Sequence, residues 1–188
     1  MGMDGWDWAT VWFIHRLRIQ RSMAKSDSFF IRATVNTNGT TYVQTSVDLG
    51  AYVDALGKSV LRIHNVAVQY GSPVASYGVS GANSTACTAF QLTTQSQSAM
   101  VNASDRSVIA SGRLAGTSDA AANTQMLSES LDVAPQHWTN GYLVGVEQIY
   151  LATDSLANAI TDNVSIVLEC TVETLSQSGA MALALSQQ

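Results

Sequence analysis

The side chains that most often carry chemistry are few and scattered in this sequence. The three histidines, His15, His64 and His137, lie far apart, and Cys87 and Cys170 form no CxxC pair. A zinc site needs three or four such ligands, usually at close spacing. The chain also has no GxSxG, HExxH or phosphate-binding glycine motif. We therefore expect a protein that is not an enzyme, and a disulfide between the two cysteines stays open.

One pair of carboxylates suggests a metal site. Asp154 and Asp162 flank the connection between the last two expected strands. Ca²⁺ prefers several oxygen ligands and tolerates irregular loops, so loop carboxylates of adjacent subunits could share one ion. The alternative is that both are solvated loop acids. Calcium is the one cofactor that the sequence suggests.

A group of basic residues near the amino end suggests an anionic partner. Residues 1–25 contain Arg16, Arg18, Arg21 and Lys25 against two acids, whereas the rest contains five basic and twelve acidic residues. The whole chain has a net charge of −5. A basic terminus on an acidic body suggests an anionic partner near that terminus, for which nucleic acid is one candidate. A solvated helix face is the alternative.

Both ends of the sequence are rich in apolar residues, which a monomer would not leave exposed. We expect these residues to form interfaces between many copies of the chain, as a homo-oligomer requires. The expected interface residues are Trp6, Trp8, Trp12, Phe13, Met181, Leu183 and Leu185. The amino-terminal apolar run is too short to cross a bilayer, so no membrane insertion is expected.

The segment 142–175 predicts two long strands joined by a polar turn, and we expect them to be antiparallel neighbours. Its second half alternates with a period of two, which indicates one buried and one wet face. The expected buried face consists of Val164, Ile166, Leu168, Cys170 and Val172. Glu169 and Glu173 fall on the wet face, where they could meet basic groups of another subunit.

The body of the chain predicts strands and little helix. The expected strands are 28–35, 41–47, 58–70, 88–95, 107–114, 125–133, 142–153 and 163–175. A short helix is expected over 48–56 and a turn over 135–141. Eight strands with several long connections favour an all-β, eight-stranded antiparallel jelly-roll sandwich, with an immunoglobulin-like sandwich as the alternative.

The expected organisation has three parts. Residues 1–27 form an amino-terminal arm or short amphipathic helix, residues 28–175 the jelly-roll domain, and residues 176–188 an apolar tail. Charged residues make up only 12% of the chain, about half the usual share. Neutral polar surfaces cost less to desolvate than charged ones, which suits a protein that packs against copies of itself.

On these features the chain resembles the single jelly-roll capsid proteins of small icosahedral viruses with single-stranded genomes. The resemblance covers residues 28–175 and rests on strand number and order, the excursion at 48–56, and the basic residues confined to the amino end. The family's arm is usually richer in arginine and lysine than this one. The resemblance implies self-assembly into a closed shell around a genome, and a place in the virion.

Two other functions remain open from the sequence. A carbohydrate- or receptor-binding β-sandwich would present aromatic side chains on a rim, for which Tyr77, Trp138 and Tyr142 are the candidates. A pilin-like filament subunit would use residues 6–21 as its assembly helix, although this stretch is short and basic for that role.

Overall fold

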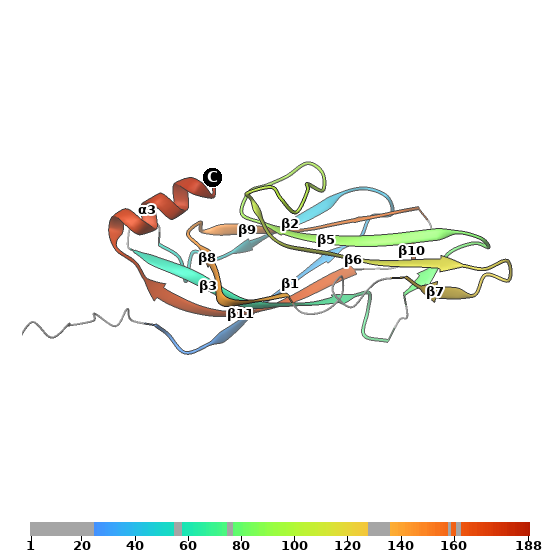
Figure 1. The fold of residues 1–188 in the computed structure, drawn as a ribbon, viewed down its shortest axis with the longest axis horizontal. Helices are drawn as coiled ribbons and strands as arrows, with labels where there is room; N and C mark the ends of the chain where they lie inside the picture. The colour runs from blue at the N-terminus through green and yellow to red at the C-terminus, as the bar shows by residue number, and fades with distance from the viewer. Residues whose placement is uncertain (1–24, 55–57, 75–76, 128–135, 158, 161–162) are drawn as a thin grey trace, which may run out of the picture.

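The computed structural model describes residues 25–54, 58–74, 77–127, 136–157, 159–160 and 163–188. Within these residues, antiparallel strands form two main sheets that lie face to face, with a short helix near the carboxyl end (Figure 1). The expected all-β class is confirmed. The expected amino-terminal helix lies outside the described residues.

The first main sheet has four strands. In spatial order they are β1 (Phe29–Asn36), β11 (Asn163–Thr174), β3 (Ser59–Tyr70) and β8 (Gln136–Val144). The second has five strands, β2 (Val43–Asp48), β9 (Gln148–Ser155), β5 (Thr85–Thr93), β6 (Val108–Ser118) and β7 (Thr124–Met126). A small sheet pairs β10 (Ala159–Ile160) with β4 (Gly78–Val79). All of these pairs are antiparallel.

The core lies between the two main sheets, where the alternating side chains of both meet. The four-stranded sheet contributes Leu61, Ile63 and Leu168, and the five-stranded sheet contributes Phe90 and Leu151, all fully buried. Burying side chains of this size stabilises a fold by about 1.5–3 kcal/mol each. The period of two in β11 therefore identifies its core face, as expected.

The eight longer strands pair in a nested order. The first strand, β1, pairs with the last, β11, and the second, β2, with the second-last, β9. The third, β3, then pairs with β8, and the two middle strands, β5 and β6, pair with each other. The chain is thus arranged as one long hairpin that has been folded over on itself.

The prediction for 142–153 was wrong in one respect. These residues belong to two strands, because β8 ends at Val144 and β9 begins at Gln148. The predicted pairing of the last two long strands was also wrong, since β9 and β11 lie in different sheets. Each already has a strand on both sides, so the connection between them must cross from one sheet to the other.

Two other local predictions changed. The expected turn at 135–141 is part of β8 from Gln136 onward. The expected helix at 48–56 is, over its described residues, a single turn in which the N–H groups of Tyr52 and Val53 both donate to the Leu49 carbonyl oxygen. Residues 55–57 lie outside the described part. Of the strand expected at 125–133, the described part is β7, which ends at Met126, and residues 128–133 lie outside the described residues.

The expected apolar tail contains a helix, α3 (Gln177–Ser186). Ser176 caps it, since its side-chain oxygen accepts a hydrogen bond of 3.2 Å from the Gly179 N–H. Such caps satisfy one of the N–H groups that a helix start leaves unpaired. The run Ala-Met-Ala-Leu-Ala-Leu then favours the helix through its propensity.

Candidate functional site

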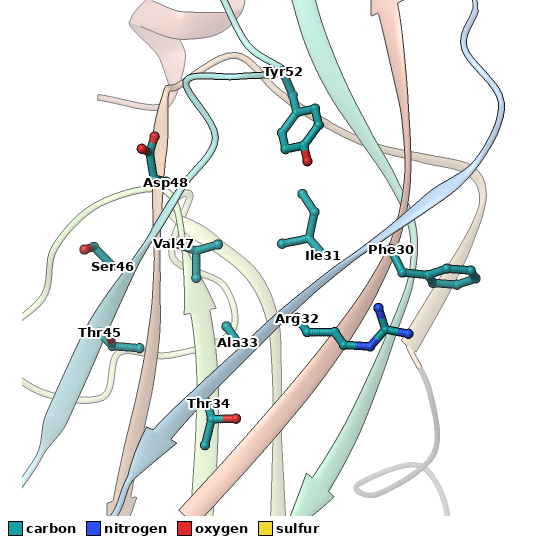
Figure 2. Close-up of a pocket in the computed structure, with 10 residues that line it drawn as sticks. All are labelled: Phe30, Ile31, Arg32, Ala33, Thr34, Thr45, Ser46, Val47, Asp48 and Tyr52. Carbon is teal, nitrogen blue, oxygen red and sulfur yellow. The ribbon is translucent and has the colours of Figure 1, made fainter.

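A groove opens where the two main sheets part along one side of the sandwich. Its walls are β1, the edge strand of the four-stranded sheet, and β2, the edge strand of the five-stranded sheet. Among the described residues, neither strand has a neighbour on its outer side. The space measures about 520 Å³. We call it the edge groove, and Figure 2 shows the side chains along it.

The floor of the edge groove is apolar and one end is aromatic. Ile31, Ala33 and Val47 point between the strands, where they meet the core (Figure 2). The Tyr52 ring stacks on Phe29 with centroids 4.7 Å apart. On the other side of β1, the Phe30 ring points away from this stack and is 54% exposed, which is unusual for a phenylalanine (Figure 2). The groove therefore offers apolar contacts between two rows of backbone groups.

The charges along the edge groove balance. The Arg32 guanidinium lies over the Phe30 ring, 5.7 Å from its centroid, which is a cation–π distance. At the other wall, the Asp48 carboxylate accepts a hydrogen bond of 2.8 Å from the Gly50 N–H. The lining residues include no histidine, cysteine or glutamate. This chemistry suits an extended polypeptide, whose main chain can pair with a free sheet edge.

A second polar group lies on the outer face of the four-stranded sheet. Glu173, only 5% exposed, accepts two hydrogen bonds of 2.7 Å from the Nε and Nη2 atoms of Arg62. Lys25 Nζ lies 3.8 Å from the same carboxylate. The bonds from Arg62 lower the pKa of Glu173, as expected for a carboxylate beside a guanidinium. The prediction that Glu173 lies on a wet face was wrong, because Arg62 and Lys25 cover it.

The Arg62 side chain in turn depends on Gly141. A Cβ at Gly141 would lie 2.6 Å from Cγ of Arg62, and the glycine has a φ of +68°. Only glycine adopts such a backbone without strain. Arg62 Nη1 also donates to the carbonyl oxygen of Asn140. The β8 backbone therefore holds the guanidinium in place from the side opposite Glu173.

At one end of the sandwich, α3 exposes an apolar face. Ala180 and Ala184 are buried, whereas Met181 and Leu185 are 44% and 68% exposed and Leu183 is half-buried. These positions lie on a helix that carries no charged residue. The three carboxyl-terminal residues expected in an assembly interface thus belong to one helix, and two of them face outward.

Gln187 fixes this helix to β8 and to the connection between β5 and β6. Its buried side chain accepts a hydrogen bond of 2.8 Å from the Gly145 N–H and donates one of 2.7 Å to the Leu143 carbonyl. The main-chain carbonyl oxygen of Gln187 accepts a hydrogen bond of 3.0 Å from the Thr94 hydroxyl. Buried polar groups with this many partners hold a segment in one position. The exposed face of α3 is therefore presented rigidly.

The opposite end of the sandwich carries another group of exposed apolar side chains. The elements there are β7, β10 and the connections next to them (Figure 1). The exposed residues are Val74, Met126, Leu127, Leu156 and Ile160. Because single exposed apolar residues are common, their grouping at one end is the informative feature.

Most of the other predicted site residues cannot be placed. Residues 1–24 lie outside the described part, and with them the predicted contacts of Arg16, Arg18 and Arg21 and the predicted interface residues Trp6, Trp8, Trp12 and Phe13. Lys25 is described, and it faces Glu173 rather than open solvent alone.

The calcium site also remains a prediction, because Asp162 lies outside the described residues. Asp154 lies near the end of β9, where its Oδ1 atom accepts a hydrogen bond of 2.8 Å from the Ser155 N–H. Within the described residues, no three histidine, cysteine or acidic side chains gather as metal ligands would.

The cysteines and histidines have structural surroundings. Cys87 and Cys170 are not joined by a disulfide. Cys170 belongs to the core, and burial raises the pKa of its thiol to about 12. His64 Nε2 lies 3.0 Å from the Thr171 hydroxyl, which places it in a packed position on the sheet surface. His137 is exposed on β8.

The aromatic residues expected to form a ligand rim are partly buried. Trp138 and Tyr142 lie on β8 with ring centroids 6.0 Å apart, and both pack against the core. Burial raises the pKa of Tyr142 and of Tyr77. Their rings therefore contribute to the sandwich itself.

Sequence reasoning missed the edge groove and the role of Gln187. No local pattern marks either one, because a free sheet edge is a property of the strand order. Arg62 and Glu173 did carry a signal, since both occupy outward positions of long strands.

Comparison with known proteins finds a weak structural likeness and no sequence match. No protein-family model and no curated protein matches this chain. Among solved structures, a chain titled Desmodium yellow mottle tymovirus superposes with a TM-score of 0.37 at 11% identity, over 84% of this chain and 91% of that one. Among the described residues, no helix is long and apolar enough to cross a membrane.

Proposed function

We propose that this chain is the structural subunit of a viral capsid, which assembles in many copies into a closed shell around a single-stranded nucleic-acid genome. The observation that carries the proposal is the nested strand order. Pairing first with last, second with second-last, and so inward, is the pattern of a jelly roll, in which one long antiparallel hairpin is wrapped into two sheets.

Jelly rolls serve as capsid subunits and as lectin or cupin domains, so the fold alone does not distinguish these functions. The distribution of side chains on the surface has to distinguish them. Exposed apolar side chains occur at both ends of the sandwich, on α3 and around β7 and β10. Surfaces of this kind on a weakly charged protein favour association with further copies. Contacts between two different patches are heterologous, and such contacts close into rings when the rotation permits.

The other parts of the proposal follow from the same assignment. The basic residues Arg16, Arg18 and Arg21 would face the enclosed genome and contact its phosphates without reading sequence. No catalytic role is proposed. A carbohydrate-binding role is not favoured, because Trp138 and Tyr142 pack against the core instead of standing on a rim.

Assembly is tested by analytical ultracentrifugation and negative-stain electron microscopy of the purified full-length chain. We expect large particles of uniform diameter with a discrete sedimentation coefficient, in the presence of single-stranded nucleic acid and at low salt. Adding calcium or a chelator would test the Asp154 and Asp162 site in the same assay. A chain that stays monomeric at high concentration under all these conditions would contradict the proposal.

A further inference from the structure

We infer that the amino-terminal segment 1–24 of the same chain fills the edge groove, with its aromatic stretch 6–14 lying extended between β1 and β2. This inference does not depend on shell assembly, because it concerns one chain. Its first support is that both walls of the groove are outermost strands of their sheets among the residues that the structure describes. The outer edge of a sheet presents a row of N–H and carbonyl groups with which an extended chain can pair.

The chemistry of the groove matches that of the segment. The groove has an apolar floor at Ile31, Ala33 and Val47 between polar walls. Tryptophan combines a large apolar ring with one N–H donor, so it suits a site that is apolar below and polar at the sides. Three of the four tryptophans in the chain lie within residues 6–14. Tyr52, exposed at one end of the groove, would gain an aromatic contact.

The length of the segment also fits. Lys25 is fixed beside Glu173, and the Ser26 N–H donates to the Val172 carbonyl at 3.0 Å, so the root of the segment is anchored. The near end of the groove, at Phe30, is five residues further along the chain, or roughly 17 Å. The ten residues 15–24 span at most about 36 Å when extended. They can therefore reverse direction and bring residue 14 to the groove.

The charges favour the same placement. Residues 1–25 carry more basic than acidic side chains, and the remaining body has seven more acids than bases. This difference attracts the segment to the body. In the proposed arrangement, Arg16, Arg18 and Arg21 lie in the solvated connection between Lys25 and the groove. They stay accessible to a polyanion while the aromatic residues are bound.

The same chain is a better source of this segment than a second copy. A short flexible connection gives an effective concentration in the millimolar range. A second copy in dilute solution is present at a far lower concentration and so competes poorly. Residues 15–24 are long enough to reach the groove from Lys25, so the segment of the same chain can bind there.

Site-specific photocrosslinking in the full-length chain tests the inference. A benzoylphenylalanine replaces Thr45, a half-buried residue on β2 whose side chain points into the groove on the same face as Val47 (Figure 2), or Thr139, an exposed residue on β8 as the control. The protein is mixed with an isotopically heavy copy before irradiation, and the crosslinked peptides are identified by mass spectrometry. We expect position 45 to capture peptides from residues 1–24 of the same isotope, and position 139 not to capture them.

Two outcomes would overturn the inference. If position 45 captures no peptide from residues 1–24, the segment does not occupy the groove. If it captures them only in mixed light and heavy products, the occupant is a second copy. Either result leaves shell assembly untouched, because sedimentation measures that separately.

Tryptophan fluorescence gives an independent readout. In a Trp138→Phe variant the remaining tryptophans are Trp6, Trp8 and Trp12. At a concentration where sedimentation shows a monomer, we expect blue-shifted emission and weak quenching by iodide. Adding Ala33→Glu, which places a charge on the groove floor, should shift the emission to longer wavelength. Emission typical of exposed tryptophan before that change would count against the inference.

Discussion

At the scale of single residues, the outer face of the four-stranded sheet depends on one carboxylate. Glu173 links the root of the amino-terminal segment, through Lys25, to β3, through Arg62. A buried carboxylate with one bidentate partner is costly to disturb, because removing either group leaves the other with unsatisfied hydrogen bonds. The free energy of unfolding should therefore respond both to substitution and to pH.

Glu173→Gln should lower the free energy of unfolding at neutral pH by about 1–3 kcal/mol, because Arg62 loses its charged partner. Arg62 holds the pKa of Glu173 below its ordinary value near 4.5, so this stabilisation is complete above that value. It is lost as the pH falls through the lower pKa of the folded state. Urea unfolding at neutral and acidic pH measures both effects.

The control for this experiment is Glu169→Gln on the same strand. We expect a change within about 0.5 kcal/mol, because Glu169 is half-buried and takes no part in the Arg62 pair. Equal losses in the two variants, or a Glu173→Gln effect that persists unchanged at low pH, would show that the ion pair is not the cause.

Gly141→Ala should destabilise the fold by more than about 1 kcal/mol, since alanine is strained at positive φ and its Cβ would meet Arg62. Gly39→Ala is the matched control, with a φ of +59° and nothing within 4 Å of the added Cβ. The difference between their thermal unfolding midpoints isolates the contact with Arg62. Identical midpoints would mean that backbone strain alone accounts for the loss.

At the scale of elements, the position of α3 is set by polar contacts more than by its apolar face. The helix buries only two alanines, whereas Gln187 joins it to β8 and to the connection between β5 and β6. A short helix with so little burial is marginal in isolation. Its order should thus be sensitive to the glutamine that follows it.

Gln187→Ala should increase hydrogen exchange across α3, because the Gly145 N–H and the Leu143 carbonyl lose their partners. Each lost bond to a buried group costs about 1–3 kcal/mol. Gln188→Ala, which changes an exposed neighbour, serves as the control. Unchanged protection of the helix in the Gln187 variant would refute the anchoring role.

At the scale of the whole molecule, exposed apolar side chains occur at both ends of the sandwich and along the edge groove. In Figure 1, α3 lies at one end of the sandwich, while β7 and the small β4–β10 sheet lie at the other. Two patches this far apart cannot cover each other within one chain. Association of copies is the arrangement that would bury both.

A double variant, Met181→Gln with Leu185→Gln, should reduce assembly strongly while leaving the thermal unfolding midpoint of the subunit nearly unchanged, because both side chains are exposed. Sedimentation velocity measures the assembly. Ser178→Gln, on an exposed position of the same helix, is the control. Normal particles from the double variant would remove α3 from the interface.

Much of the fold could be read from the sequence, but little of the site could. The alternation in 163–175 correctly gave a strand and its core face, because a period of two is a local property. The partners of that strand could not be read in the same way, since the chain crosses between sheets after β9. Alternation also assigned Glu173 to the outer face correctly, yet it could not tell that Arg62 would cover it.

The turn expected at 135–141 shows a related limit. Gly141 suggested a break in the strand, and β8 does become irregular there, between the residues opposite Ile63 and Asn65. The strand continues nevertheless, because pairing with β3 resumes on both sides of the irregularity. The local residues favour a turn, but pairing with β3 keeps residues 136–141 in a strand.

The central position of β11 affects when the molecule can form during its synthesis. This strand lies between β1 and β3, and its Cys170 pairs with Phe29 across most of the chain. Contacts this distant in sequence form slowly, because a long loop must close first. A ribosome must therefore release nearly the whole chain before the four-stranded sheet can close. Until then β1 and β3 lack the strand that lies between them, so their apolar side chains stay exposed on the nascent chain.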